Sequence, residues 1–117
     1  MAKITTHILD VARGKPAVGV DVRLEKSDAA GSFTLVRASA TDDDGRAKTL
    51  TDPDGVGAGT YRLTFDTGGY YARLATDTFY PYAQVIFVVP LAAPGASQHF
   101  HVPLLLSPFG YSTYRGS

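Results

Sequence analysis

Three histidines are the residues of this chain best suited to acid–base chemistry: His7, His99 and His101. Imidazole titrates near neutral pH, so each side chain can accept or donate a proton in a reaction at that pH. Cysteine is absent, which excludes disulfides, thiolate metal sites and a cysteine nucleophile. Imidazole, guanidinium, hydroxyl and phenol groups are therefore the candidates for chemistry.

Alternation along the strands predicts which way the histidines point. In the first segment Ile4 and Ile8 are expected to face the core, so His7 and Leu9 face outward. In the segment 98–106 alternate positions are expected to face the core: Phe100, Val102, Leu104 and Leu106. The positions between them are expected to face outward: His99, His101, Pro103 and Leu105. The simplest interpretation of each histidine alone is a solvated surface residue, and His99, beside a loop, fits it best.

A metal site is not favoured at these histidines. His99 and His101 would lie roughly 6.6 Å apart along one strand face, which is long for a shared ion. No acidic ligand lies in the same third of the chain. We therefore expect no metal and no cofactor.

Arg46 follows the Asp-Gly turn 42–45 and has two interpretations. It is either a surface charge beside Asp42, Asp43 and Asp44 or a partner for an anion or oxyanion, because the guanidinium offers a fork of donors. Together these residues are compatible with hydrolysis through an activated water and equally with a passive ligand groove.

The elements that must position these residues are short strands separated by turns. Twelve glycines and seven prolines in 117 residues favour strands over helices, and the length suits one domain, residues 1–117. The predicted strands are 4–11, 18–24, 33–41, 46–50, 60–66, 83–90, 98–106 and 111–115, with one short helix at 67–75. Segment 83–90 is nearly all apolar, which predicts a strand covered on both faces. The pattern as a whole predicts an all-β, antiparallel β-sandwich.

Charge and hydropathy exclude several kinds of partner. Eleven basic and eleven acidic residues balance, which gives no reason to expect nucleic acid or an anionic membrane. No signal-peptide pattern or 18-residue apolar run is present, so a cytoplasmic location is expected. The charges are uneven, however, because none of the residues from Thr78 to Tyr114 is Asp, Glu, Lys or Arg. A second apolar face packed on a neighbouring subunit would explain this charge-free segment.

Four motifs resemble those of the 5-hydroxyisourate hydrolases, the transthyretin-like enzymes of urate breakdown. They are Thr6-His7-Ile8-Leu9-Asp10, Asp44-Gly45-Arg46, the segment from His99 to Pro108 and the ending Tyr114-Arg115-Gly116-Ser117. The resemblance runs from Ile4 to Ser117. It implies a transthyretin-like sandwich of two four-stranded sheets with one short helix. It also implies a homotetramer, a dimer of dimers, with active sites in a channel between the dimers.

The resemblance also implies the site and the reaction. It places His7, Arg46, His101 and Tyr114 at catalytic positions, with His7, Arg46, Tyr114 and Ser117 binding substrate. The implied activity is that of a cyclic amide hydrolase, which opens 5-hydroxyisourate to 2-oxo-4-hydroxy-4-carboxy-5-ureidoimidazoline in purine catabolism. In the expected metal-free mechanism the histidines activate water, Arg46 offsets negative charge and Tyr114 positions the ring.

A carrier is the alternative, because transthyretin binds thyroid hormone in the equivalent channel. Hormone carriers lack the polar set of His7, Arg46, His101 and the Tyr-Arg-Gly-Ser ending. This polar set favours the enzyme.

Overall fold

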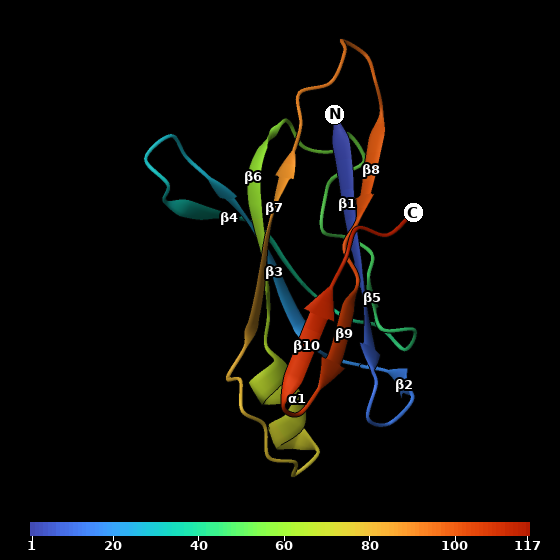
Figure 1. Cartoon of the computed structure of the whole chain (residues 1–117). Coiled ribbons are helices and arrows are strands. Elements are labelled where there is room, and N and C mark those ends of the chain that lie inside the picture. Colours follow the sequence, from blue (N-terminus) through green and yellow to red (C-terminus); the bar gives the residue numbers. More distant parts are fainter.

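Two packed β-sheets and one short helix make up the fold of the computed structural model, which describes all residues from 1 to 117 (Figure 1). The elements follow the chain in this order: β1 (Ala2–Asp10), β2 (Lys15–Pro16), β3 (Asp21–Ser27), β4 (Phe33–Ala40), β5 (Arg46–Ala47), β6 (Gly59–Phe65), α1 (Thr67–Arg73), β7 (Ala83–Val89), β8 (Gln98–His101), β9 (Leu104–Ser107) and β10 (Gly110–Thr113). The predicted sandwich with one short helix is confirmed.

The sheets differ in how their strands pair. One has the order β4-β3-β6-β7 and is antiparallel throughout. The other has six strands instead of the expected four, since the two-residue strands β2 and β5 both pair with β1. The prediction of a wholly antiparallel sandwich is wrong in this sheet, because β1 runs parallel to β8 and β9.

A break at Val102 and Pro103 divides the segment predicted as one strand into β8 and β9. Proline has no N–H to donate to a strand ladder, which favours an interruption. The Thr6 hydroxyl donates to the Val102 carbonyl at 2.6 Å, and the Thr113 hydroxyl donates to that of Pro103 at 2.7 Å. Pro103 is buried here, so its predicted outward orientation is wrong. The outward orientation of His99 and His101 is confirmed.

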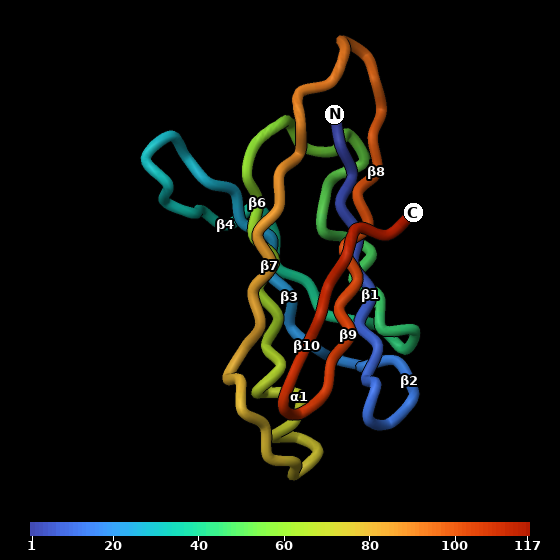
Figure 2. Tube along the Cα trace, viewed as in Figure 1, coloured from blue at the N-terminus to red at the C-terminus, as the bar shows by residue number.

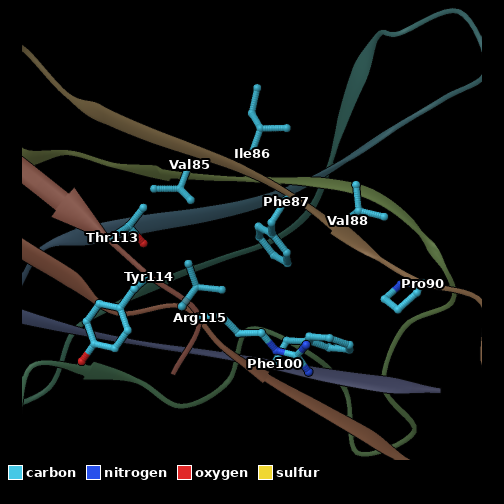
Figure 3. A pocket seen from close by; sticks show the side chains of 10 residues that line it. Val85, Ile86, Phe87, Val88, Pro90, Phe100, Thr113, Tyr114 and Arg115 are labelled. Carbon is cyan, nitrogen blue, oxygen red and sulfur yellow. The ribbon is translucent and has the colours of Figure 1, made fainter. Parts of the chain in front are cut away.

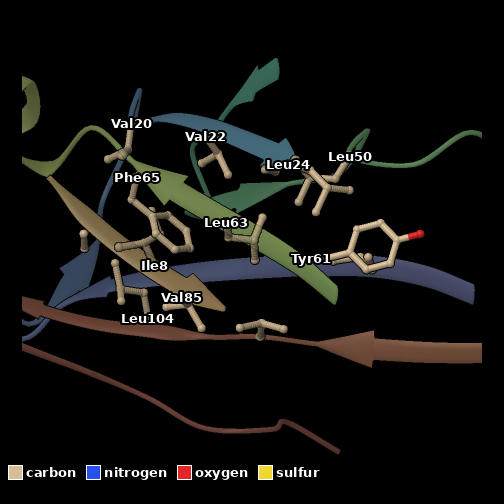
Figure 4. Close-up of a cluster of buried hydrophobic side chains, with 14 of the residues drawn as sticks. Ile8, Val20, Val22, Leu24, Leu50, Tyr61, Leu63, Phe65, Val85 and Leu104 are labelled. Atoms are coloured by element: carbon tan, nitrogen blue, oxygen red, sulfur yellow. The ribbon is translucent and has the colours of Figure 1, made fainter. Parts of the chain in front are cut away.

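The core fills the space between the two sheets (Figure 4). Ile8 from β1 and Leu104 from β9 meet Leu63 and Phe65 from β6, and all four side chains are fully buried. Each fully buried aliphatic or aromatic side chain contributes about 1.5–3 kcal/mol to the hydrophobic stabilisation of the fold. The core holds β1 rigidly, and β1 carries His7 on its opposite face.

The helix α1 closes one end of the sandwich, as the chain trace shows (Figure 2). Asp66 caps its first turn by accepting a hydrogen bond from the Gly69 amide at 3.0 Å. The Tyr70 hydroxyl then donates to the buried Asp10 carboxylate at 2.7 Å, which ties the helix to the end of β1. With seven residues, α1 is the one helix, and no helix here is long and apolar enough to cross a membrane.

One face of β7 is exposed within the chain, contrary to the prediction that both faces are covered. Ala83, Val85 and Val89 are buried, whereas Ile86 is 60% exposed and Val88 is 65% exposed. β7 is also an edge strand of its sheet. Most of the other exposed large hydrophobic side chains likewise lie in the charge-free segment: Phe79, Tyr82, Leu91, Phe109, Tyr111 and Tyr114.

Candidate functional site

The parallel pairing of β1 with β8 brings the two ends of the chain together at the candidate site. In this register Thr5 lies opposite His101 and Lys3 opposite His99. The odd-numbered residues of β1 face away from the core, so Thr5 and His7 share a face with both of these histidines. Sequence reasoning could place His7 and His101 on outer faces, and only the strand pairing makes them neighbours.

The Asp-Gly turn delivers Arg46 to the same face. Arg46 on β5 pairs with His7 on β1 in an antiparallel register. Gly45 makes this approach possible, since its φ is +77° and a Cβ there would lie 2.6 Å from the Ile8 carbonyl oxygen. The Asp-Gly-Arg motif therefore has a geometric reason in this fold.

Arg46 keeps its guanidinium free of the three neighbouring aspartates. The Asp42 carboxylate accepts from the backbone amides of Asp44 and Arg46 at 2.9 and 3.1 Å, and it pairs with Lys48 at 3.2 Å. These contacts lower the pKa of Asp42, chiefly through the hydrogen bond from the Arg46 amide. No acidic side chain forms a salt bridge with Arg46 itself. The guanidinium is thus available to an anionic or polar ligand.

The C-terminal tetrapeptide packs directly against His101. The Gly116 amide donates to the His101 carbonyl at 2.8 Å. A Cβ at Gly116 would lie 2.6 Å from Cδ2 of the His101 ring, so a larger residue would displace the imidazole. This contact brings Ser117 to the site and explains the glycine of the ending.

We call the resulting depression the histidine groove. It has a volume of about 390 Å³ and is lined by Thr5, Thr6, Arg46, Ala47, Lys48, His99, His101 and Ser117. No aspartate or glutamate is among the lining residues, and no group of three His, Asp or Glu side chains anywhere in the structure is arranged to hold a metal ion. Thr5, Lys48 and His99 line the groove although sequence reasoning did not assign them a role there.

The electrostatics of the groove favour a neutral imidazole at His101. Burial lowers the pKa of His101 below its ordinary value, and coulombic interactions with the nearby side chains of Arg46, His7 and His99 lower it further. A neutral imidazole has a free lone pair and can accept a proton. His101 therefore has the protonation state that a general base needs near pH 7.

Tyr114 lies outside the histidine groove. It lines a second depression, which we call the edge cleft, of about 490 Å³ (Figure 3). The other lining residues come mainly from β7 and the C-terminal segment: Val85, Ile86, Phe87, Val88, Pro90, Phe100, Val102, Thr113 and Arg115. The Arg115 guanidinium lies over the Phe100 ring, 4.7 Å from its centroid. Of the five predicted site residues, the structure gathers Arg46, His101 and Ser117 in one groove, sets His7 beside Arg46, and leaves Tyr114 in the edge cleft.

Comparison with known proteins shows the family of the chain. The HIUase/Transthyretin family matches residues 4–116. The 5-hydroxyisourate hydrolase of Mus musculus is 44% identical over 115 residues, which span 97% of this chain and 94% of that protein. The uric acid degradation bifunctional protein TTL of Arabidopsis thaliana is 46% identical across 97% of this chain, which spans only 37% of that longer protein.

Solved structures are similar over the whole fold. The 5-hydroxyisourate hydrolase of Klebsiella pneumoniae has a TM-score of 0.83 and 38% identity, covering 100% of this chain and 94% of that one. Sea bream transthyretin in complex with thyroxine has a TM-score of 0.86 and 33% identity, covering 97% of this chain and 93% of that one. By sequence and by structure, the chain belongs to the HIUase/Transthyretin family.

Proposed function

We propose that this protein is a cyclic amide hydrolase that opens 5-hydroxyisourate to 2-oxo-4-hydroxy-4-carboxy-5-ureidoimidazoline in urate degradation. The observation that carries the proposal is the histidine groove, in which His101, whose pKa is lowered by burial, lies with the unpaired guanidinium of Arg46. Hydrolysis of an amide needs a base for water and a donor for the oxyanion, and these two residues are suited to those tasks. The names of the mouse and Klebsiella relatives support this substrate.

In the proposed mechanism His101 removes a proton from water while the resulting hydroxide attacks the ring carbonyl carbon. The tetrahedral intermediate carries its negative charge on the former carbonyl oxygen, and Arg46 stabilises that oxyanion. When the C–N bond breaks, the proton passes from His101 to the leaving nitrogen. His7, beside Arg46 on β1, orients the water and the substrate, and Ser117 contacts the ring at the end of the groove.

We further propose a homotetramer, a dimer of dimers, with substrate sites between the dimers. Support comes from the exposed apolar face of β7, where Ile86 and Val88 are 60% and 65% exposed. Burial of such side chains at a subunit interface is favourable by roughly 25 cal/mol per Å² of apolar surface. In this proposal Tyr114, which lies in the edge cleft of the single chain, reaches substrate only in the assembled protein.

A carrier of thyroxine, the ligand named with the sea bream protein, is not favoured. Only one of the eight residues lining the histidine groove is hydrophobic. An apolar, halogenated ligand would leave Arg46, Lys48 and the histidines desolvated without hydrogen-bond partners, which is costly.

The decay of 5-hydroxyisourate tests the proposed activity. Urate oxidase generates this compound from urate, and its ultraviolet absorbance then falls at a spontaneous rate. The protein is expected to accelerate the decay in proportion to its concentration. A decay equal to the spontaneous rate, together with thyroxine binding measured by calorimetry, would contradict the hydrolase proposal and favour a carrier.

A further inference from the structure

The hydroxyl of Thr5 lies between two imidazoles. Its Oγ1 is 2.8 Å from Nε2 of His99 and 2.9 Å from Nδ1 of His101. The register of β1 with β8 produces this geometry, because Thr5 pairs with His101 and the two histidines alternate onto the same face. One oxygen therefore contacts a ring nitrogen of each histidine.

Counting protons shows that these two contacts are not equivalent. A threonine hydroxyl has one proton to donate, and each neutral imidazole has one N–H and one bare nitrogen. Oγ1 can donate to only one of the two nitrogens, so the other nitrogen must carry a proton and donate to Oγ1. The two tautomers are consequently coupled through the hydroxyl.

The direction of these two hydrogen bonds follows from the proposed function, on which the inference rests. Nδ1 of His101 is occupied by Thr5, which leaves Nε2 as the nitrogen free to accept a proton from water. A bare Nε2 requires the proton on Nδ1, and this N–H donates to Oγ1. The Thr5 hydroxyl then donates to Nε2 of His99. We propose that Thr5 is a positioning residue that, with His99 as its acceptor, holds His101 in the Nδ1–H tautomer with Nε2 open to the reacting water.

The same arrangement suits both halves of the reaction. When Nε2 of His101 accepts a proton from water, the Nδ1–H bond to Oγ1 is unchanged, so neither the ring nor Thr5 has to move. When the proton leaves for the substrate nitrogen, the original tautomer returns. No hydrogen bond has to be reversed during a turnover, which keeps the base pre-organised.

The charges around His101 explain why a neutral partner is useful here. The groups that face it are Arg46, His7 and His99, with Lys48 also lining the groove, and none of them is an acid. A carboxylate on Nδ1 would favour the imidazolium and raise the pKa of His101. The uncharged Thr5 hydroxyl orients the ring without that effect, and the lowered pKa of His101 agrees with this.

Substitution of Thr5 separates positioning from folding. Thr5→Val removes the hydroxyl and keeps the branched shape, so kcat is expected to fall about tenfold with KM nearly unchanged, the loss of about one hydrogen bond. Thr5→Ser keeps the hydroxyl and should restore most of kcat. Thr34→Val on β4 is a matched control far from the groove and should leave kcat unchanged. Equal rates for wild type and Thr5→Val would overturn the proposal while leaving the hydrolase activity intact.

The tautomers themselves can be read without substrate. Two-bond proton–nitrogen NMR correlations of ¹⁵N-histidine protein, at a pH where the imidazoles are neutral, are expected to show His101 protonated on Nδ1. In Thr5→Val the same ring should show a mixture of tautomers. Protonation of His101 on Nε2 in the wild type would refute the assigned direction. Since this readout needs no turnover, it holds even if the protein fails to accelerate the decay of 5-hydroxyisourate, which would count against the proposed function alone.

Discussion

The histidine groove and the edge cleft are depressions of one small chain with opposite character. The groove is lined by one hydrophobic residue of eight, and its side chains are linked by hydrogen bonds from β1 to β8. The edge cleft is lined by seven hydrophobic residues of ten and borders the exposed strand β7. The larger cleft therefore has the apolar lining expected of an assembly surface, and the smaller groove has the polar side chains on which the proposed chemistry depends.

This difference also explains the charge-free segment. The strands after Thr78 supply the apolar side of the edge cleft and also carry His101. The positive charge of the groove comes from Arg46 and Lys48, which reach it from the turn after Ala40. In the proposed tetramer this segment packs on its own core and on a neighbouring subunit, which excludes charge, so the cation of the groove comes from elsewhere in the chain.

Removing the base should have the largest effect on the groove. His101→Asn keeps a polar side chain of similar size and removes the proton acceptor, so kcat should fall by ~10²–10⁴. The rate is measured by the decay of 5-hydroxyisourate, and the mass by light scattering should equal that of the wild type. Undiminished turnover in a correctly assembled variant would remove His101 from the mechanism.

Removing the cation should have the next largest effect. Arg46→Gln is expected to lower kcat by ~10²–10³ through loss of the oxyanion donor. Because the charge of Arg46 lowers the pKa of His101, its removal should raise that pKa, and the acidic limb of the rate–pH profile should move to higher pH. The matched control is Arg37→Gln, since Arg37 pairs with Asp52 outside the groove. An acidic limb at the same pH in Arg46→Gln and wild type would argue against this coupling.

A charge introduced at the edge cleft should weaken the assembly of subunits and change the stability of the single chain little. Ile86→Glu places a charge on the exposed face of β7, so the tetramer should dissociate while the single chain changes in stability by only about 0.5 kcal/mol. Light scattering should give about four times 12.4 kDa for the wild type and a smaller mass for this variant. Val18→Glu, at a valine 46% exposed outside the cleft, is the control. A monomer with full activity would contradict a site shared between subunits.

Alternation and turn residues predicted much of the fold, because these signals are local. Except for 98–106, which divides into β8 and β9, every predicted strand has a counterpart whose ends differ by at most three residues, and the helix begins at Thr67 as expected. The parallel pairing of β1 with β8 and β9 was missed, since pairing depends on contacts between distant segments. The buried Pro103 was missed for a related reason, because Thr6 and Thr113 hold the break in the strand from elsewhere in the chain.

The residue pattern alone predicted the site only as residue types on outer faces, and the family resemblance added the five named positions His7, Arg46, His101, Tyr114 and Ser117. That His7 and Arg46 are register partners follows from the close approach at Gly45, which no spacing in the sequence reveals. His99 was interpreted as a solvated residue, and it is indeed exposed, yet Thr5 links it to His101. Tyr114 was expected beside the histidines, and its place in the edge cleft is not visible in a motif.

A crystal structure with urate, the unreactive precursor of the substrate, tests most directly which of the two depressions binds the substrate. The account predicts the purine ring in the histidine groove, with one of its oxygens about 2.9 Å from the Arg46 guanidinium and Nε2 of His101 facing a ring carbonyl carbon. Urate bound only in the edge cleft, among Ile86, Val88 and Phe100, would contradict it.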